Sequence, residues 1–155
     1  MSDPILNAET ICQVGIIVHD IERTAQRYCE VFGFDMPEIM ETSGFERSKT
    51  TYNGQPSEAT AKLAFFNAGQ ITIELIEPDE KPSVWREFLE QHGEGVHHVA
   101  FQVKDTKAVT GALAETGVGI AQQGLYSDGS GIYTYVDAGP LLGTMFELLE
   151  NFPRK

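Results

Sequence analysis

Four polar side chains of the types that bind metals or move protons stand at matching places in two similar halves of this chain. They are Gln13 and Glu74 in the first half and His98 and Glu147 in the second. An imidazole, an amide oxygen and two carboxylates suit a divalent cation in a mostly oxygen site with positions open to substrate. Such a cation polarises a carbonyl group, and a carboxylate beside it can take a neighbouring proton. Taken singly, a glutamine of this kind is more often a solvated side chain and the two glutamates more often edge-strand charges, and the histidine is also compatible with a core position.

The two halves repeat one order of strands and helices. Residues 13–20 and 98–105 alternate apolar with other residues, as strands do, and each run ends in an aspartate placed to cap a helix. Apolar residues then recur at helical spacing until Gly33 in the first half and Gly117 in the second. Each half ends in a further strand, at 71–78 and at 144–151.

Between the helix and the final strand, each half has room for two more strands. Turn signals such as Asn53-Gly54 and Asp128-Gly129 separate the apolar runs. The segment 42–60 is expected to be a polar loop, and residues 79–95 a proline-led linker with a short helix over 84–91. The additional strands are expected at about 34–41, 61–67, 118–122 and 131–136.

This order predicts an α+β fold of two tandem βαβββ modules that form a cupped mixed sheet around the candidate site. Module 1 covers about 10–78, the linker 79–95 and module 2 about 96–151, within a single domain over 1–155. A length of 155 residues is ample for one sizeable core.

Alternation along each strand assigns its side chains to one face of the sheet. Apolar stripes such as Val14, Ile16 and Val18 are expected to pack on the helices. That leaves the four polar side chains on the concave face. The same alternation puts His97 on the packed face and favours His98 as the histidine of the site.

The paired strands QVGIIVHD and HHVAFQVKD, with ELIEP and FELLE closing the halves, resemble the vicinal-oxygen-chelate (glyoxalase) superfamily over residues 11–150. The resemblance implies one divalent metal ion (Co, Zn, Ni or Mn) held between the modules. It also implies a homodimer. Carried over position by position, the implied metal ligands are Gln13, Glu74, His98 and Glu147.

Within the superfamily, the segments FNAG before ELIEP and GEGVHH before the second repeat are most similar to methylmalonyl-CoA epimerases. This likeness implies an isomerase that abstracts a proton from methylmalonyl-CoA and passes through a metal-stabilised enolate. By analogy with metal-bound carboxylates in glyoxalases, Glu147 is the first choice of acid–base group and Glu74 the second. Epimerases usually have histidine in place of Gln13, and some carry a candidate glutamate base that aligns with Lys62.

Three alternatives stay open. The set Gln, Glu, His, Glu is that of the zinc type of lactoylglutathione lyase (glyoxalase I), although the arginines that bind glutathione there align with Ile17 and Glu94. Another metal-dependent isomerase or lyase of the superfamily is the second. The third is a different class, a non-catalytic drug-binding resistance protein without metal. Extradiol dioxygenase is disfavoured, because iron there uses two histidines and one carboxylate.

Composition limits the partners. A net charge of −12 repels phosphate backbones, so no nucleic acid is expected, and the substrate is a small acyl-CoA or related carbonyl compound. Arg47, Lys49 and Lys62 either meet the phosphates of a CoA carrier or form a solvated surface.

No apolar run reaches the roughly 18 residues of a membrane span and no signal pattern opens the chain, so we expect a cytoplasmic protein without membrane contact. Cys12 and Cys29 are expected to be buried free thiols.

Overall fold

A computed structural model describes residues 3–6 and 10–154, and within them ten strands form one mixed sheet. The strands are β1 (Gln13–Ile17), β2 (Met40–Glu41), β3 (Thr51–Tyr52), β4 (Gln55–Pro56), β5 (Ala61–Asn67), β6 (Thr72–Pro78), β7 (Gly95–Gln102), β8 (Ile120–Leu125), β9 (Gly131–Val136) and β10 (Met145–Asn151). The helices are α1 (Ile21–Phe32), α2 (Phe45–Ser48), α3 (Val84–His92), α4 (Thr106–Glu115) and α5 (Gly139–Leu142).

The sheet shows the predicted repeat as two equivalent groups of four strands. Its order is β2-β5-β6-β1-β7-β10-β9-β8-β3-β4. In each half the first strand runs parallel to the last, β1 with β6 and β7 with β10. The halves meet where β1 pairs antiparallel with β7. The predicted α+β fold with a cupped mixed sheet is therefore confirmed.

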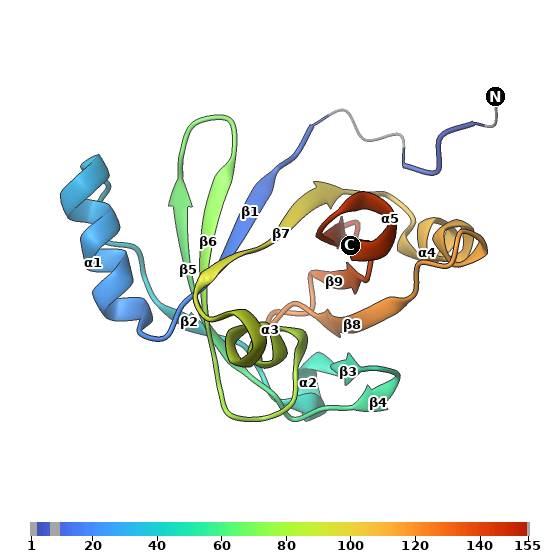
Figure 1. Ribbon diagram of the computed structural model, residues 1–155, viewed down its shortest axis with the longest axis horizontal. Coiled ribbons are helices and arrows are strands. Elements are labelled where there is room, and N and C mark those ends of the chain that lie inside the picture. The colour runs from blue at the N-terminus through green and yellow to red at the C-terminus, as the bar shows by residue number, and fades with distance from the viewer. Residues whose placement is uncertain (1–2, 7–9, 155) are drawn as a thin grey trace.

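The two long helices begin and end where the sequence places their caps. The Asp20 carboxylate accepts from the Arg23 N–H at 3.0 Å, and the Asp105 carboxylate accepts from the Ala108 N–H at 3.0 Å. Gly33 ends α1 in the left-handed region, with φ of 73°. Figure 1 shows α1 beside β5 and β6, and α4 on the opposite side of the molecule.

The alternation of side chains separates an outer from an inner face. On the outer face, Ile16, Val18 and Leu75 pack with α1, while Phe146 and Leu148 pack with α4. On the inner face, α3 closes one end of the cup. Its Trp85 and Leu89 join a cluster with three residues of the strands, Ile17, Ile76 and Tyr135.

Two expectations in the first half are wrong. The expected strand at 34–41 is reduced to β2, and the expected loop 42–60 contains α2 and the hairpin β3–β4. Asn53 and Gly54 form the hairpin turn, with φ of 50° and 77°, as a two-residue turn of this kind requires. The hairpin is held by pairing of β3 with β8, about 70 residues away, and no local pattern reveals such a partner.

Residues 42–60, called the crossing segment below, connect the two ends of the sheet (Figure 1, cyan to turquoise). In a flat sheet, eight strand spacings would separate β2 from β3 by roughly 38 Å. The residues between Glu41 and Thr51 include the α2 helix and span at most roughly 27 Å. The sheet must therefore curl, and the crossing segment runs between its edges.

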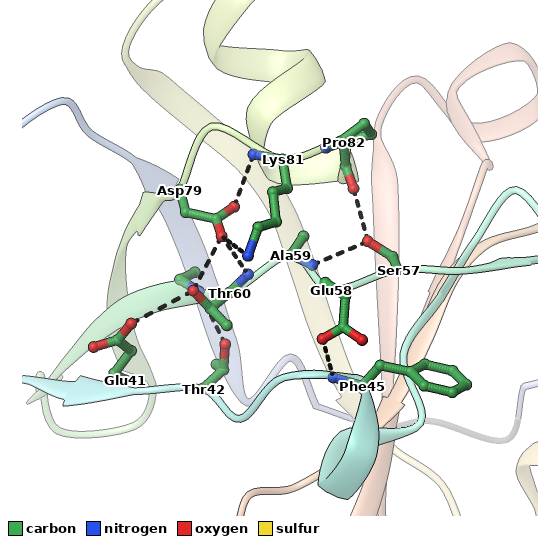
Figure 2. A network of polar contacts seen from close by, with 11 residues as sticks. Glu41, Thr42, Phe45, Ser57, Glu58, Ala59, Thr60, Asp79, Lys81 and Pro82 are labelled. Atoms are coloured by element: carbon green, nitrogen blue, oxygen red, sulfur yellow. Dashed lines mark hydrogen bonds and ion pairs between the residues drawn. The ribbon is translucent and has the colours of Figure 1, made fainter.

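Hydrogen bonds tie the end of the crossing segment to the linker after β6 (Figure 2). The Asp79 carboxylate accepts from the backbone and hydroxyl of Thr60 at 3.1 and 3.2 Å, and from the Lys81 backbone at 3.0 Å. The Ser57 hydroxyl donates to the Pro82 carbonyl at 3.0 Å. The same linker leads directly into α3, so these bonds couple the crossing segment to that helix.

Two further expectations concern compartment and thiols. None of the helices in the described part of the chain has the length and apolar character needed to cross a bilayer. Cys12 and Cys29 are free thiols as predicted, but each is only partly buried.

Candidate metal centre

The four predicted side chains lie on the four central strands, one on each. Gln13 is on β1, Glu74 on β6, His98 on β7 and Glu147 on β10. Their exposed fractions are 8%, 5%, 0% and 4%, and carboxylates buried to this extent require a cation or hydrogen-bond donors beside them. The structure therefore brings together all four residues that the sequence singled out. Their roles as metal ligands and acid–base groups stay predictions.

The side-chain atoms of the other three residues converge on Nε2 of His98. His98 Nε2 lies 2.8 Å from Glu147 Oε2, 3.5 Å from Glu74 Oε2 and 3.3 Å from Gln13 Oε1. Around a metal ion with ligands at about 2.1 Å, neighbouring ligands stand about 3.0 Å apart at right angles and about 3.4 Å apart in a tetrahedron. The donor set and its spacing fit a divalent cation, and the buried triad Glu74, His98 and Glu147 could hold one.

The Gln13 amide has two orientations with opposite consequences. With its oxygen inward, it faces only acceptor atoms, which is favourable beside a cation. With its nitrogen inward, it donates to Glu74 at 3.0 Å and to Glu147 at 2.9 Å. The first orientation suits a loaded site, and the second satisfies the carboxylates without a metal.

Protonation follows from burial and close charge. Burial raises the pKa of Glu74 to about 7, with the charge of Glu147 adding to the effect and His98 opposing it. For His98, burial disfavours the charged form, but the carboxylates, Glu147 first, outweigh burial and raise the pKa to about 9. Without a metal, the site therefore holds a proton on His98 at neutral pH.

His97 departs from the expected alternation. The pairing of β1 with β7 shifts register between Gly15 and Ile16, opposite His98 and Val96, so His97 is an extra bulged residue. Its ring contacts Phe88 of α3 and Tyr135 of β9, on the inner side of the sheet. The expectation that His97 lies on the helix-packed face is therefore wrong, because a bulge interrupts the period of two.

Gly15 provides the space for the His98 ring. The two residues are paired across β1 and β7. A Cβ atom on Gly15 would lie 1.9 Å from His98 Cε1, a distance no real contact allows. The sequence showed Gly15 on the same face as Gln13, and only the pairing of the halves shows what it accommodates.

A cavity of about 500 Å³ opens beside the centre. Gln13, Glu74 and Glu147 form part of its wall, so the ligand atoms are accessible from it. Among the described residues that line it, none is lysine, arginine or histidine. Acidic side chains other than the two of the centre are Glu41 and Asp128.

Sequence reasoning missed most of the residues that shape this cavity. Tyr133 and Tyr135 of β9 line it, and alternation on β9 opposite Glu147 could have identified Tyr135. The Trp85 Nε1–H donates to the Tyr135 hydroxyl at 2.9 Å, which fixes both rings. Ser48 and Thr50 come from the crossing segment, which the sequence predicts to be a loop.

Three residues that bear on the alternatives lie away from the cavity. Lys62 is on the outer face of β5, half-exposed and 3.9 Å from Glu77, and so lies on the other side of the sheet from the four side chains. Ile17 is fully buried in the inner cluster. Glu94 accepts from the His19 backbone at 3.0 Å. Neither position supplies a cation for a glutathione carboxylate.

Residues 12–136 match the family model described as Glyoxalase/Bleomycin resistance protein/Dioxygenase superfamily. A segment of 88 residues is 48% identical to the uncharacterized protein YqjC of Bacillus subtilis, and it covers 57% of this chain and 53% of that protein. The match therefore spans about half the length of that relative.

Two solved structures have the same fold. A methylmalonyl-CoA epimerase from Mycobacterium tuberculosis is 20% identical, with a TM-score of 0.65, over 99% of this chain and 93% of that one. A variant methylmalonyl-CoA epimerase of Streptomyces coelicolor in complex with 2-nitronate-propionyl-CoA is 24% identical, with a TM-score of 0.65, over 94% of this chain and 99% of that one. At these identities the likeness establishes the fold.

Proposed function

Because this chain belongs to the glyoxalase/bleomycin resistance protein/dioxygenase superfamily, we propose that it is a metal-dependent enzyme that moves a proton beside a carbonyl group. One observation carries the proposal. Side-chain atoms of Gln13, Glu74 and Glu147 lie within 3.5 Å of His98 Nε2 at the wall of a cavity of about 500 Å³. Without a metal, these two buried carboxylates depend on a proton on His98 and on the Gln13 amide turned with its nitrogen inward.

The residues of the centre have distinct roles in the proposal. Gln13, Glu74, His98 and Glu147 would hold one divalent cation, and the chemistry it would supply is polarisation of the substrate carbonyl. Glu147 is the proposed acid–base group, with Glu74 second. The aromatic wall of Trp85, Tyr133 and Tyr135 keeps water from the reacting carbon.

Methylmalonyl-CoA is the first proposed substrate, and the reaction is epimerisation. Its support is the shared fold with structures named methylmalonyl-CoA epimerases. Arg47 also lies beside the cavity wall, since its Nη2 donates to the carbonyl of the lining residue Ser127 at 3.3 Å. We propose that Arg47 contacts a phosphate of the CoA carrier outside the cavity.

A second substrate class is favoured by the charge of the cavity. A dication bound to two carboxylates is neutral, so a chelating substrate carboxylate would leave one uncompensated negative charge. No cationic side chain lines the described wall to balance it. An uncharged chelating substrate, such as the hemithioacetal of a thiol and a ketoaldehyde, leaves the centre neutral. Such a substrate corresponds to the lyase alternative, although this chain lacks the arginines that bind glutathione in lactoylglutathione lyase.

Proton exchange in deuterated water tests both substrates. Methylmalonyl-CoA and an uncharged hemithioacetal are each incubated with metal-reconstituted protein (cobalt or zinc) and with metal-free protein, and proton NMR follows the hydrogen beside the carbonyl. Metal-dependent loss of that signal from methylmalonyl-CoA supports the epimerase. Loss from the hemithioacetal alone supports the lyase. No loss from either, with metal bound, contradicts the proposed chemistry.

Matched variants locate the exchange in the centre. Glu147→Gln keeps the size of the side chain and removes its basicity, and we expect exchange to fall at least about 100-fold. The control Glu115→Gln lies on the exposed surface of α4 and is expected to leave exchange unchanged. Arg47→Ala is expected to raise the KM of a CoA substrate without lowering kcat, which an uncharged small substrate would not show.

A further inference from the structure

The second ring nitrogen of His98, Nδ1, also has a hydrogen-bond partner. His98 directs Nε2 at Glu74, Glu147 and Gln13, while its Nδ1 lies 3.0 Å from Nδ1 of the preceding residue, His97. Neighbouring side chains on a regular strand point to opposite faces and do not make this contact. The bulge at His97 makes it possible, because it turns both rings to the inner side.

The contact has one consistent arrangement of protons when a metal is bound. A metal ion on His98 Nε2 leaves the only ring hydrogen on Nδ1. That hydrogen is then donated to His97 Nδ1, which must be unprotonated. The hydrogen of neutral His97 therefore lies on its Nε2, and the two rings hold each other in defined tautomers.

The surroundings of His97 hold its ring in this position. It is 4% exposed, and its described contacts are with His98 and with two aromatic rings, at centroid distances of 5.1 Å to Phe88 and 5.5 Å to Tyr135. Phe88 is on α3 and Tyr135 is on β9. The ring is thus fixed between the inner helix and the second half of the sheet.

We propose that His97 is a positioning residue, which accepts the Nδ1 hydrogen of His98 and thereby holds that imidazole in the tautomer and orientation that bind the metal. The inference rests on the proposed metal centre. Partners of this kind contribute to metal affinity by removing the rotational freedom of the ligand ring and by making its free nitrogen a better donor. His97 itself touches neither metal nor substrate.

Metal affinity tests the assignment without reference to activity. Titration of metal-free protein with Co²⁺ or Zn²⁺ by calorimetry is compared for wild type, His97→Leu and His97→Asn. Leucine fills the volume but accepts no hydrogen bond, so we expect metal binding about 10–100-fold weaker. Asparagine places an oxygen near the position of Nδ1, and we expect it to restore most of the affinity. Equal affinity in His97→Leu and wild type would overturn the proposal.

A matched control separates the hydrogen bond from packing. His92 also contacts the Phe88 ring, at a centroid distance of 4.9 Å, but it is exposed and makes no described hydrogen bond or ring contact with His98. His92→Leu is expected to bind metal like wild type. If His97→Asn and His97→Leu lose the same affinity and the same thermal stability, His97 acts through packing alone and the proposal is wrong.

A measurement on the wild-type protein avoids any folding defect of the variants. Co²⁺-loaded protein in ordinary water is expected to show one paramagnetically shifted N–H proton signal, from His98 Nδ1, that exchanges slowly because it is buried and bonded. A signal that exchanges too fast to observe would overturn the proposed bond. Failure to bind Co²⁺ at all would instead refute the metal centre itself, so the two failures are distinguishable.

Discussion

Gly15 and His98 face each other across β1 and β7, and the imidazole occupies the space in which any other residue would carry its Cβ atom. We therefore predict that Gly15→Ala displaces the ring. The expected result is metal binding weakened at least about 10-fold and a loss of about 1–3 kcal/mol in the free energy of unfolding. Calorimetric metal titration and urea unfolding measure the two effects.

The control for this substitution is another glycine. Gly111 lies in α4, and a Cβ atom there would meet nothing within 4 Å. Gly111→Ala is expected to leave metal binding unchanged and to stabilise the helix by about 1 kcal/mol. If Gly15→Ala binds metal as tightly as wild type, the His98 ring can move aside without loss of affinity and the prediction is wrong.

The pH dependence of stability should differ between the metal-free and the loaded protein. In the metal-free fold His98 keeps its proton up to a pKa of about 9, above its ordinary value of 6.5, so it stabilises the fold fully below pH 6.5. That contribution is lost as the pH rises from 6.5 to about 9, with a slope of at most about 1.4 kcal/mol per pH unit. Burial raises the pKa of Glu74 from 4.5 to about 7, so the free energy of unfolding also falls as the pH rises from 4.5 to about 7.

A bound metal takes the place of the proton on His98, so the loaded protein should not show this fall. Urea unfolding at three pH values between 6.5 and 9, with Zn²⁺ and with chelator, is the measurement. His97 does not complicate that range, because burial, followed by the charge on His98, lowers its pKa to about 3. Equal slopes in both conditions would mean that the metal does not displace this proton.

Among the elements, the crossing segment forms part of the cavity wall, with Thr42, Ser48 and Thr50 among the lining residues. Two hydrogen bonds from Thr60 to the Asp79 carboxylate tie this segment to the linker before α3, and a third, from the Lys81 backbone, lies within the linker (Figure 2). Asp79→Ala is predicted to lower the free energy of unfolding by about 1–3 kcal/mol, since it removes the charged acceptor of three hydrogen bonds. It should also speed hydrogen exchange in residues 42–60 and leave exchange in α4 unchanged.

Glu80 is the control for that prediction, because it is the adjacent acidic residue and is exposed. Glu80→Ala is expected to change stability by less than about 0.5 kcal/mol. If Asp79→Ala behaves in the same way, the linker bonds do not hold the crossing segment.

In the molecule as a whole, the candidate centre joins the two halves, because β1 and β6 come from the first and β7 and β10 from the second. A metal that binds only the folded chain stabilises it by mass action, by about 2.7 kcal/mol at a concentration 100 times Kd. We predict that the melting temperature rises with Zn²⁺ concentration and falls with chelator. Glu74→Gln should weaken this dependence, whereas a rise equal to that of wild type would place the metal elsewhere.

The homodimer implied by the family resemblance stays a prediction. Light scattering at several protein concentrations is expected to give twice the mass of one chain, with and without metal. The mass of a single chain throughout would contradict it.

The sequence by itself determined the elements whose causes are local. The aspartate caps, Gly33 and the apolar alternation define α1, α4 and the central strands, and the repeat assigns Gln13 and Glu74 to places equivalent to those of His98 and Glu147. Only the tertiary structure decided how far apart these atoms lie, the turn of His97 to the inner side and the strand partner of the crossing segment. Each depends on pairing between residues distant in the sequence, where a one-residue bulge or a remote edge strand changes the result without leaving a local pattern.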